Sequence, residues 1–117
     1  MSNRIYLSPP SMSKLEKKYL DEAFDSNWIA PQGPSLDKFE EDIANYLNVE
    51  KTVATSSGTA ALHLALRVLE IERGDRILCP SLTFAASANV IIYEGAEPIF
   101  IDSDPKTWVI DLNALEQ

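Results

Sequence analysis

Apolar and polar residues follow a helical period through the first half of this chain. Spacings of three and four predict an amphipathic helix that starts after Ser11 or Ser13 and ends near Asn27. A second helix is expected from Ser35, a good N-cap, to Asn48. The stripe of the first helix consists of Met12, Leu15, Tyr19 and Ala23 or Phe24. The stripe of the second, which we expect to be buried, consists of Leu36, Phe39, Ile43, Tyr46 and Leu47.

The second half alternates short strand-like runs with apolar helices. We predict strands over 51–55, 76–80 and 97–102, and helices over about 59–70 and 84–93. The sequence also predicts a left-handed helix end at Gly74, closure of the next helix by Gly95, a brief strand over 108–110 and a helix capped by Asp111. The helix over 59–70 is apolar on nearly every side, which predicts that it is buried. Strands that alternate with helices favour an α/β fold with parallel strands and right-handed crossovers.

Small hydrogen-bonding residues fill the turn between the first of these strands and its helix. A helix N-terminus leaves backbone N–H groups without partners and attracts anions. Gly58 would let the backbone approach a ligand closely, and Ser57 or Thr59 could add a hydroxyl. One interpretation is therefore a phosphate-binding turn. The other is an ordinary strand-to-helix turn with a serine N-cap.

A second loop is expected beside this turn. Ligands of parallel sheets bind outside the carboxyl ends of the strands. The serine turn and the loop after Pro80, which carries Phe84, should therefore meet at one edge of the sheet. A phosphate seat beside an aromatic ring is typical of a site for a planar phosphorylated ligand.

Composition narrows the classes of function. The 117 residues, 45% hydrophobic and 24% charged, suit one globular domain with a core. A net charge of −8 argues against binding to nucleic acid or an anionic membrane. The sequence has neither an apolar run near the roughly 20 residues of a membrane span nor the apolar core of a signal peptide, which favours a cytoplasmic location. Cys79 is expected to be a buried structural thiol. The acidic run of the second helix predicts a solvated face, and we predict no metal site.

Five spaced motifs resemble those of one enzyme family. They are Trp28-Ile29 with Gly33-Pro34-Ser35-Leu36-Asp37-Lys38-Phe39-Glu40, then Ser56-Ser57-Gly58-Thr59-Ala60-Ala61-Leu62-His63-Leu64-Ala65-Leu66, then Gly74-Asp75, then Pro80-Ser81-Leu82-Thr83-Phe84 with Asn89, and finally the run from Gly95 to Pro105. Together they resemble the sugar-nucleotide aminotransferases of the DegT/DnrJ/StrS type, which are fold-type I pyridoxal phosphate enzymes. The resemblance covers nearly the whole chain.

The resemblance implies a fold and a set of site residues. It implies a three-layer αβα large domain with a mainly parallel sheet, of which residues 1–34 form an N-terminal helix and entrance segment and 35–117 part of the α/β core. It places the phosphate of pyridoxal phosphate on Gly58, Thr59 and Ala60, with Ser57 adjacent, and stacks the pyridine ring on Phe84. Without the resemblance, the favoured interpretation of Phe84 is a core phenylalanine at the start of a helix. Three further residues, with less support, are candidates for substrate binding: Trp28, Thr83 and Asn89. His63 is expected to be a hydrogen-bonded histidine of the core rather than a catalytic one.

The resemblance also implies that the catalytic residues lie elsewhere. The family's chains are several times longer, and their Schiff-base lysine and the carboxylate that holds the pyridine nitrogen protonated lie beyond the position of Gln117. None of the lysines here matches that lysine's motif: Lys14, Lys17, Lys18, Lys38, Lys51 and Lys106. We therefore expect no catalytic residue in the chain and no transaminase activity from it alone.

Three hypotheses follow. The chain is a truncated aminotransferase whose parent moves an amino group from an amino acid, commonly glutamate, to a keto-sugar nucleotide. Alternatively, it is a non-catalytic module that binds pyridoxal phosphate or phosphate and self-assembles, because fold-type I enzymes build their sites across a dimer and a homo-oligomer is therefore expected. A third hypothesis, an unrelated nucleotide-binding α/β domain, explains only the serine turn.

Overall fold

The computed structural model describes residues 4–116 and divides the chain into two compact units, residues 1–52 and 53–117. Residues 1–3, part of the N-terminus in which we found no signal-peptide core, lie outside the described residues, as does Gln117. Each unit is described by itself.

Unit 1 contains the two predicted helices, α1 (Leu15–Asp25) and α2 (Pro34–Leu47). Ser13 precedes α1: its Oγ accepts a hydrogen bond from the N–H of Leu15 at 3.1 Å and donates to Glu16 Oε2 at 2.6 Å. The N-cap position itself is Lys14, without a side-chain cap bond, so neither Ser11 nor Ser13 is the N-cap, and Ser13 contacts the helix start from one residue earlier. After α1, Asn27 takes a left-handed conformation with φ of 57°, where we expected the helix to end.

The start of α2 differs from the prediction. Gly33 is the N-cap and Pro34 the first helical residue, so Ser35 lies inside the first turn rather than capping it. Proline is favoured at this position because its missing N–H would have had no intrahelical partner. At the other end, Asn48 is a left-handed C-cap with φ of 53°, which confirms the predicted end.

The apolar stripe of α2 is not buried as expected. Phe39 is 55% exposed and Tyr46 85%, and among the described residues of unit 1 only Ala44 is buried. Helical periodicity predicts which residues share a face, but burial also requires a second surface against that face.

The described part of unit 2 is an α/β arrangement of five elements: α3 (Gly58–Val68), β1 (Arg76–Pro80), α4 (Ala86–Tyr93), β2 (Glu97–Ile101) and α5 (Leu112–Leu115). β1 and β2 pair in parallel, with Cys79 opposite Phe100, and α4 is the crossover between them. This confirms both predicted strands and their parallel pairing. Gly95, with φ of 76°, follows α4 as expected, and Asp111 Oδ1 caps α5 by accepting from the N–H of Asn113 at 2.8 Å.

Three local predictions for the chain after α2 are wrong. Residues 51–55 are irregular instead of forming a strand. β-branched residues favour an extended backbone, but a strand also needs a neighbouring strand to hydrogen-bond to. The described sheet pairs only β1 with β2. The left-handed residue that ends α3 is Glu70 rather than Gly74. The N–H of Glu70 donates to the carbonyl oxygen of Arg67, and the N–H of Ile71 donates to the carbonyl oxygen of Leu66. The predicted strand over 108–110 is reduced to one antiparallel bridge, between Ser103 and Ile110.

The core of unit 2 lies between β1 and the helices. Cys79, Ile91 and Ala96 form its buried centre, and Leu66 of α3 and Ile77 pack against it. Cys79 is 2% exposed, which confirms the predicted buried thiol, and burial raises the pKa of its thiol. α3 itself has no buried residue, contrary to its predicted burial, because only one side of it meets the core.

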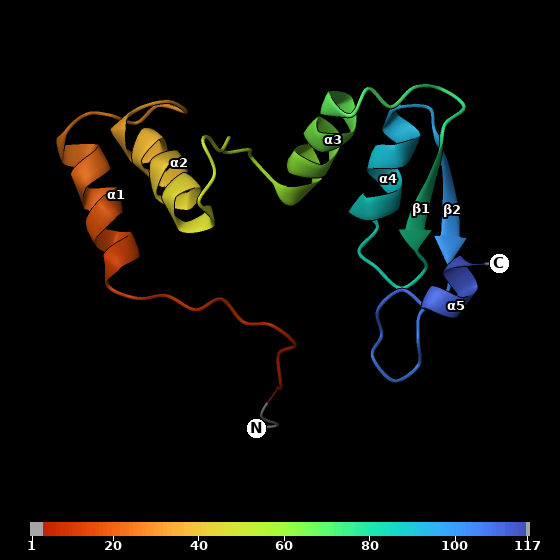
Figure 1. Cartoon of the computed structure of the whole chain (residues 1–117). Helices are drawn as coiled ribbons and strands as arrows, with labels where there is room; N and C mark the ends of the chain where they lie inside the picture. Colours follow the sequence, from red (N-terminus) through yellow and green to blue (C-terminus); the bar gives the residue numbers. More distant parts are fainter. Residues whose placement is uncertain (1–3, 117) are drawn as a thin grey trace. The chain divides into compact units, whose positions relative to one another are not determined.

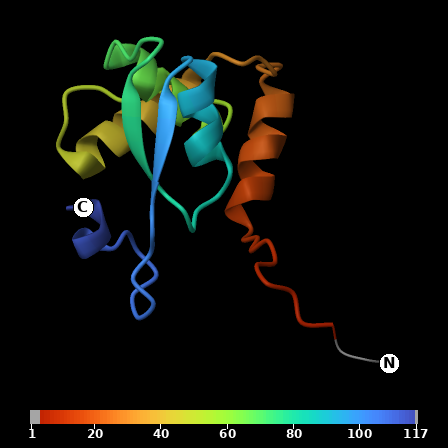
Figure 2. The same cartoon turned by 90° about the vertical axis from the view of Figure 1, so that its right-hand side faces the viewer.

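Both helices run in the same direction beside the sheet. Figure 1 shows the first turns of α3 and α4 at the end toward which β1 and β2 point. The loop after β2 continues past this end and returns to α5 (Figure 2). The predicted carboxyl edge therefore exists. Among residues 4–116 no helix is long and apolar enough to cross a membrane, and no group of metal-ligating side chains occurs.

Candidate functional site

The start of α3 has the features of an anion-binding turn. Ser57 has an extended backbone, and its Oγ accepts a hydrogen bond from the N–H of Ala60 at 3.1 Å. The carbonyl of Ser57 accepts from the N–H of Ala61 at 3.0 Å. In the part of the chain that the structure describes, no protein acceptor takes the N–H of Gly58 or Thr59. These two N–H groups point out of the helix start with nothing from the protein to satisfy them.

Access to this turn is open. A Cβ placed on Gly58 would find no atom within 4 Å, so an anion can reach the backbone there. The Ser57 hydroxyl accepts from Ala60 and keeps its own proton for a further acceptor. The residues therefore fit a phosphate group. Ala60 differs from the expectation in one respect, because its N–H is already bonded to Ser57.

The loop before α4 carries the aromatic candidate. α4 begins at Ala86, two residues later than predicted, and Phe84 lies in the preceding loop with 80% of its surface exposed. Thr83 Oγ1 and Ser87 Oγ lie 3.0 Å apart, which ties this loop to the first turn of α4. Asn89 is exposed on α4. The structure brings the two loops to one end of unit 2, while a shared site of Phe84 with residues 57–60 stays a prediction.

The ends of the two strands are joined by a polar contact that we did not predict. Ser81 follows β1, and its Oγ donates to Asp102 Oδ1 at 3.1 Å, while its N–H donates to Ile101 O at 2.9 Å. Asp102 follows β2 directly. The sequence places both residues at or just after the end of a predicted strand, and this position could have predicted that they lie near each other. This contact fixes the loops at the carboxyl edge of the sheet.

A buried carboxylate joins α3 to α4 at the opposite end. The Glu94 side chain is 4% exposed, with Oε1 lying 2.7 Å from His63 Nε2 and Oε2 lying 3.1 Å from Arg67 Nη1. Apart from this contact, Oε1 is buried without a hydrogen-bond partner among the described atoms. The His63 side chain is 42% exposed, which contradicts its predicted position in the core. This cluster positions α3 against α4.

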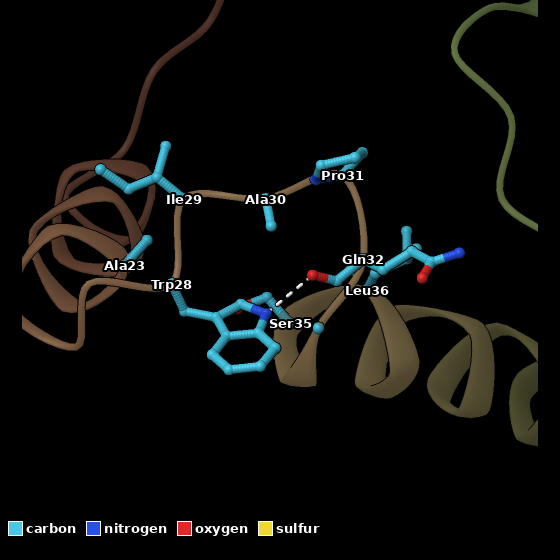
Figure 3. A pocket seen from close by; sticks show the side chains of 9 residues that line it. Ala23, Trp28, Ile29, Ala30, Pro31, Gln32, Ser35 and Leu36 are labelled. Carbon is cyan, nitrogen blue, oxygen red and sulfur yellow. Dashed lines mark hydrogen bonds between the residues drawn. The ribbon is translucent and has the colours of Figure 1, made fainter.

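Trp28 belongs to unit 1 and lies in the loop between α1 and α2. Its indole Nε1 donates to the carbonyl oxygen of Gln32 at 2.7 Å, and the residue is 55% exposed. Figure 3 shows this hydrogen bond closing an arch of the chain from Trp28 to Gln32. The structure therefore gives Trp28 a fixed orientation.

Unit 2 has parallel strands and an accessible helix start at their carboxyl edge. This arrangement agrees with the class that the motifs imply, the fold-type I pyridoxal phosphate enzymes. Among solved structures the chain is similar to Spr1654 of Streptococcus pneumoniae, named as a sugar aminotransferase and solved in its PLP form, with a TM-score of 0.86 and 38% identity over 97% of this chain and 29% of that one. It is also similar to the aminotransferase from Psychrobacter cryohalolentis, with a TM-score of 0.84 and 31% identity over 93% of this chain and 28% of that one.

The family follows from the sequence comparison. Residues 10–117 match the DegT/DnrJ/EryC1/StrS aminotransferase family, and the chain belongs to it. It is 55% identical to EpsN of Bacillus subtilis strain 168, which is named as a pyridoxal phosphate-dependent aminotransferase. The match covers all of this chain and 30% of EpsN. It is 45% identical to the GDP-perosamine synthase of Escherichia coli O157:H7, over 92% of this chain and 30% of that one. The chain thus spans about 30% of the length of these relatives, pyridoxal phosphate is the cofactor of the family, and the α/β fold class is confirmed.

Proposed function

We propose that this chain is the N-terminal part of a pyridoxal phosphate-dependent sugar-nucleotide aminotransferase. The whole enzyme would transfer an amino group from an amino acid such as glutamate to a keto-sugar nucleotide. The observation that supports this most directly is the accessible start of α3, which offers two free N–H groups and the Ser57 hydroxyl inside the range that matches the family. When bound, the cofactor supplies an electron sink for the amino-acid carbon.

Within this chain the residues divide by role. The N–H groups of Gly58 and Thr59, with the hydroxyls of Ser57 and Thr59, would hold the phosphate, and Ala60 would supply the helix turn that Ser57 caps. Phe84, exposed in its loop, would cover one face of the ring. Thr83 and Asn89 would border the substrate. We assign residues 1–34 to the entrance segment and 35–117 to the core of one large domain, in a cytoplasmic enzyme.

The chain alone is proposed to bind but not to react. Its described lysines are exposed, and those on α1 and α2 pair with acids one turn away, as Lys17 does with Asp21 at 2.9 Å. A solvated, paired lysine keeps its proton and is a poor nucleophile. Detection of glutamate-dependent amination by the pure 117-residue protein would contradict this part of the proposal.

The test is a titration with pyridoxal phosphate, followed by borohydride reduction and peptide mass mapping. We expect saturable binding that inorganic phosphate competes away, without a specific lysine adduct. Thr59→Ala should weaken it about tenfold or more, since a hydrogen bond to a charged group contributes about 1.5–3 kcal/mol. Ser11→Ala, which removes an exposed hydroxyl from unit 1, is the control. Labelling of several lysines without saturation would contradict the phosphate site.

A second candidate function is a self-assembling module without catalytic chemistry. Large apolar side chains on the described strands and helices favour it, among them Leu78 and Phe100, which are 55% and 57% exposed. A homo-oligomer would cover them. Light scattering coupled to size exclusion decides the point: a monomer at high protein concentration would contradict assembly and leave the phosphate site untouched.

A further inference from the structure

The loop between α1 and α2 encloses an open pocket of about 460 Å³ that lies wholly within unit 1 (Figure 3). None of the side chains that line it is charged, although charged residues are common on both neighbouring helices. Trp28 forms one wall, and Ile29 and Leu36 contribute apolar surface. Gln32 and Ser35 are its polar side chains, and the amide of Gln32 extends away from the indole in Figure 3.

Two contacts hold the indole of Trp28 in place. Its Nε1–H donates to the carbonyl oxygen of Gln32 at 2.7 Å, so the polar edge of the ring is already satisfied. The ring also lies directly on Gly33, since a Cβ at that position would occupy the same space as the indole nitrogen. Gly33 has φ of 147°, a conformation that side-chain-bearing residues rarely adopt. One side of the ring is therefore packed on backbone, while 55% of the residue remains exposed.

We propose that this pocket is a nucleobase site, in which the fixed indole of Trp28 stacks on the base of a nucleoside diphosphate sugar. The inference rests on the proposed function for the identity of the ligand. A planar, uncharged ring suits an aromatic wall with neutral surroundings, and the lining side chains offer no cation to pair with a diphosphate. Because the ring is held before binding, little conformational entropy is lost on stacking.

The test uses saturation-transfer NMR on the full chain, with guanosine and thymidine as probes and free ribose, which like them carries no phosphate, as the matching ligand without a base. Transfer should be strongest to the base protons of both nucleosides, and ribose should show none. Trp28→Ala should weaken nucleoside binding about tenfold to a hundredfold, the usual range for loss of an aromatic stacking partner. Trp28→Phe, which keeps a ring but cannot donate to Gln32, should lose less than Trp28→Ala.

Trp108→Ala is the matched control, because Trp108 is 72% exposed in unit 2 and should leave nucleoside binding unchanged. Circular dichroism checks that α1 and α2 survive in each variant. Equal binding by wild type and Trp28→Ala would overturn the inference, and so would no nucleoside binding, which would leave the pocket as a surface for another protein segment.

The two proposals fail separately. Nucleoside binding without phosphate-competed binding of pyridoxal phosphate would support this pocket and contradict the cofactor site. Binding of pyridoxal phosphate without nucleoside binding would do the reverse.

Discussion

The two units of the chain are held together in different ways. In unit 1 most side-chain contacts join residues no more than four positions apart, such as Lys17 with Asp21 in α1 and Trp28 with Gln32 in the following loop. In unit 2 they join distant segments: Arg67 reaches Glu94, 27 residues away, and Ser81 reaches Asp102, 21 residues away. Isolated helices of this length are marginal in water. The difference teaches that unit 2 has a core of its own, whereas the helices of unit 1 depend on local contacts.

The largest expected difference in stability between the two units comes from removing a buried side chain from the core of unit 2. Ile91 is 3% exposed and packs against Cys79 and Ala96, so Ile91→Ala should cost about 2–5 kcal/mol of unfolding free energy. Leu20→Ala in α1, where the side chain is 60% exposed, should change it by less than about 0.5 kcal/mol. Urea unfolding followed by circular dichroism measures both. Equal effects would show that unit 1 also has a core.

The next largest effect should come from the carboxylate that joins α3 to α4. Glu94→Gln removes a charge held by His63 and Arg67 on a side chain that is 4% exposed, and should cost about 1–3 kcal/mol. Asp21→Asn breaks an ion pair of similar length, 2.9 Å, whose side chains are 80% and 60% exposed. It should cost about 0–1 kcal/mol, because solvent screens such pairs. A larger loss for Asp21→Asn than for Glu94→Gln would contradict the comparison.

Local signals in the sequence were enough for much of the fold. The runs over 76–80 and 97–102 correctly predicted β1 and β2, Asn48 ends α2 as expected, and Asp111 caps the start of α5 as expected. Residues 51–55 carried the same β-branched signal but form no strand. A strand depends on a partner elsewhere in the chain, and no local pattern contains that information. The prediction that the apolar stripe of α2 is buried was wrong for the same reason.

In the candidate site, too, local contacts could be predicted from the sequence and contacts between distant segments could not. The N-cap at Ser57 could be predicted because a serine bonds its own helix three residues on. The contact of Glu94 with His63 and Arg67 could not, since it requires α3 and α4 to be placed side by side. Four-residue spacing of His63 and Arg67 showed only that both lie on one face.

A smaller effect tests the start of α3. Ser57→Ala removes the acceptor for the N–H of Ala60 and should destabilise the helix by about 1 kcal/mol, whereas Ser57→Gly should cost only a few tenths. Hydrogen exchange at the amides of Ala60 and Ala61 measures this locally. Ser56→Ala, at the exposed neighbouring position, is the control. Faster exchange in Ser56→Ala than in Ser57→Ala would contradict the role of Ser57 as the cap.

The smallest effect concerns the loop after β2, where order in unit 2 is again local. Asp104 Oδ1 accepts from the N–H groups of Thr107 and Lys106, both at 2.8 Å, and these bonds lower the pKa of the carboxyl group. Because the folded pKa is depressed, the carboxylate stabilises the loop above the ordinary aspartate value of about 4 and loses this effect as the pH falls through the lowered value. Trp108, whose N–H bonds to Asp104 O at 2.8 Å, reports on the loop by fluorescence in a Trp28→Phe background. Emission should stay constant from neutral pH to about pH 4 and shift below it. Asp104→Asn should remove that acid transition, and the same transition in both proteins would assign it to another group.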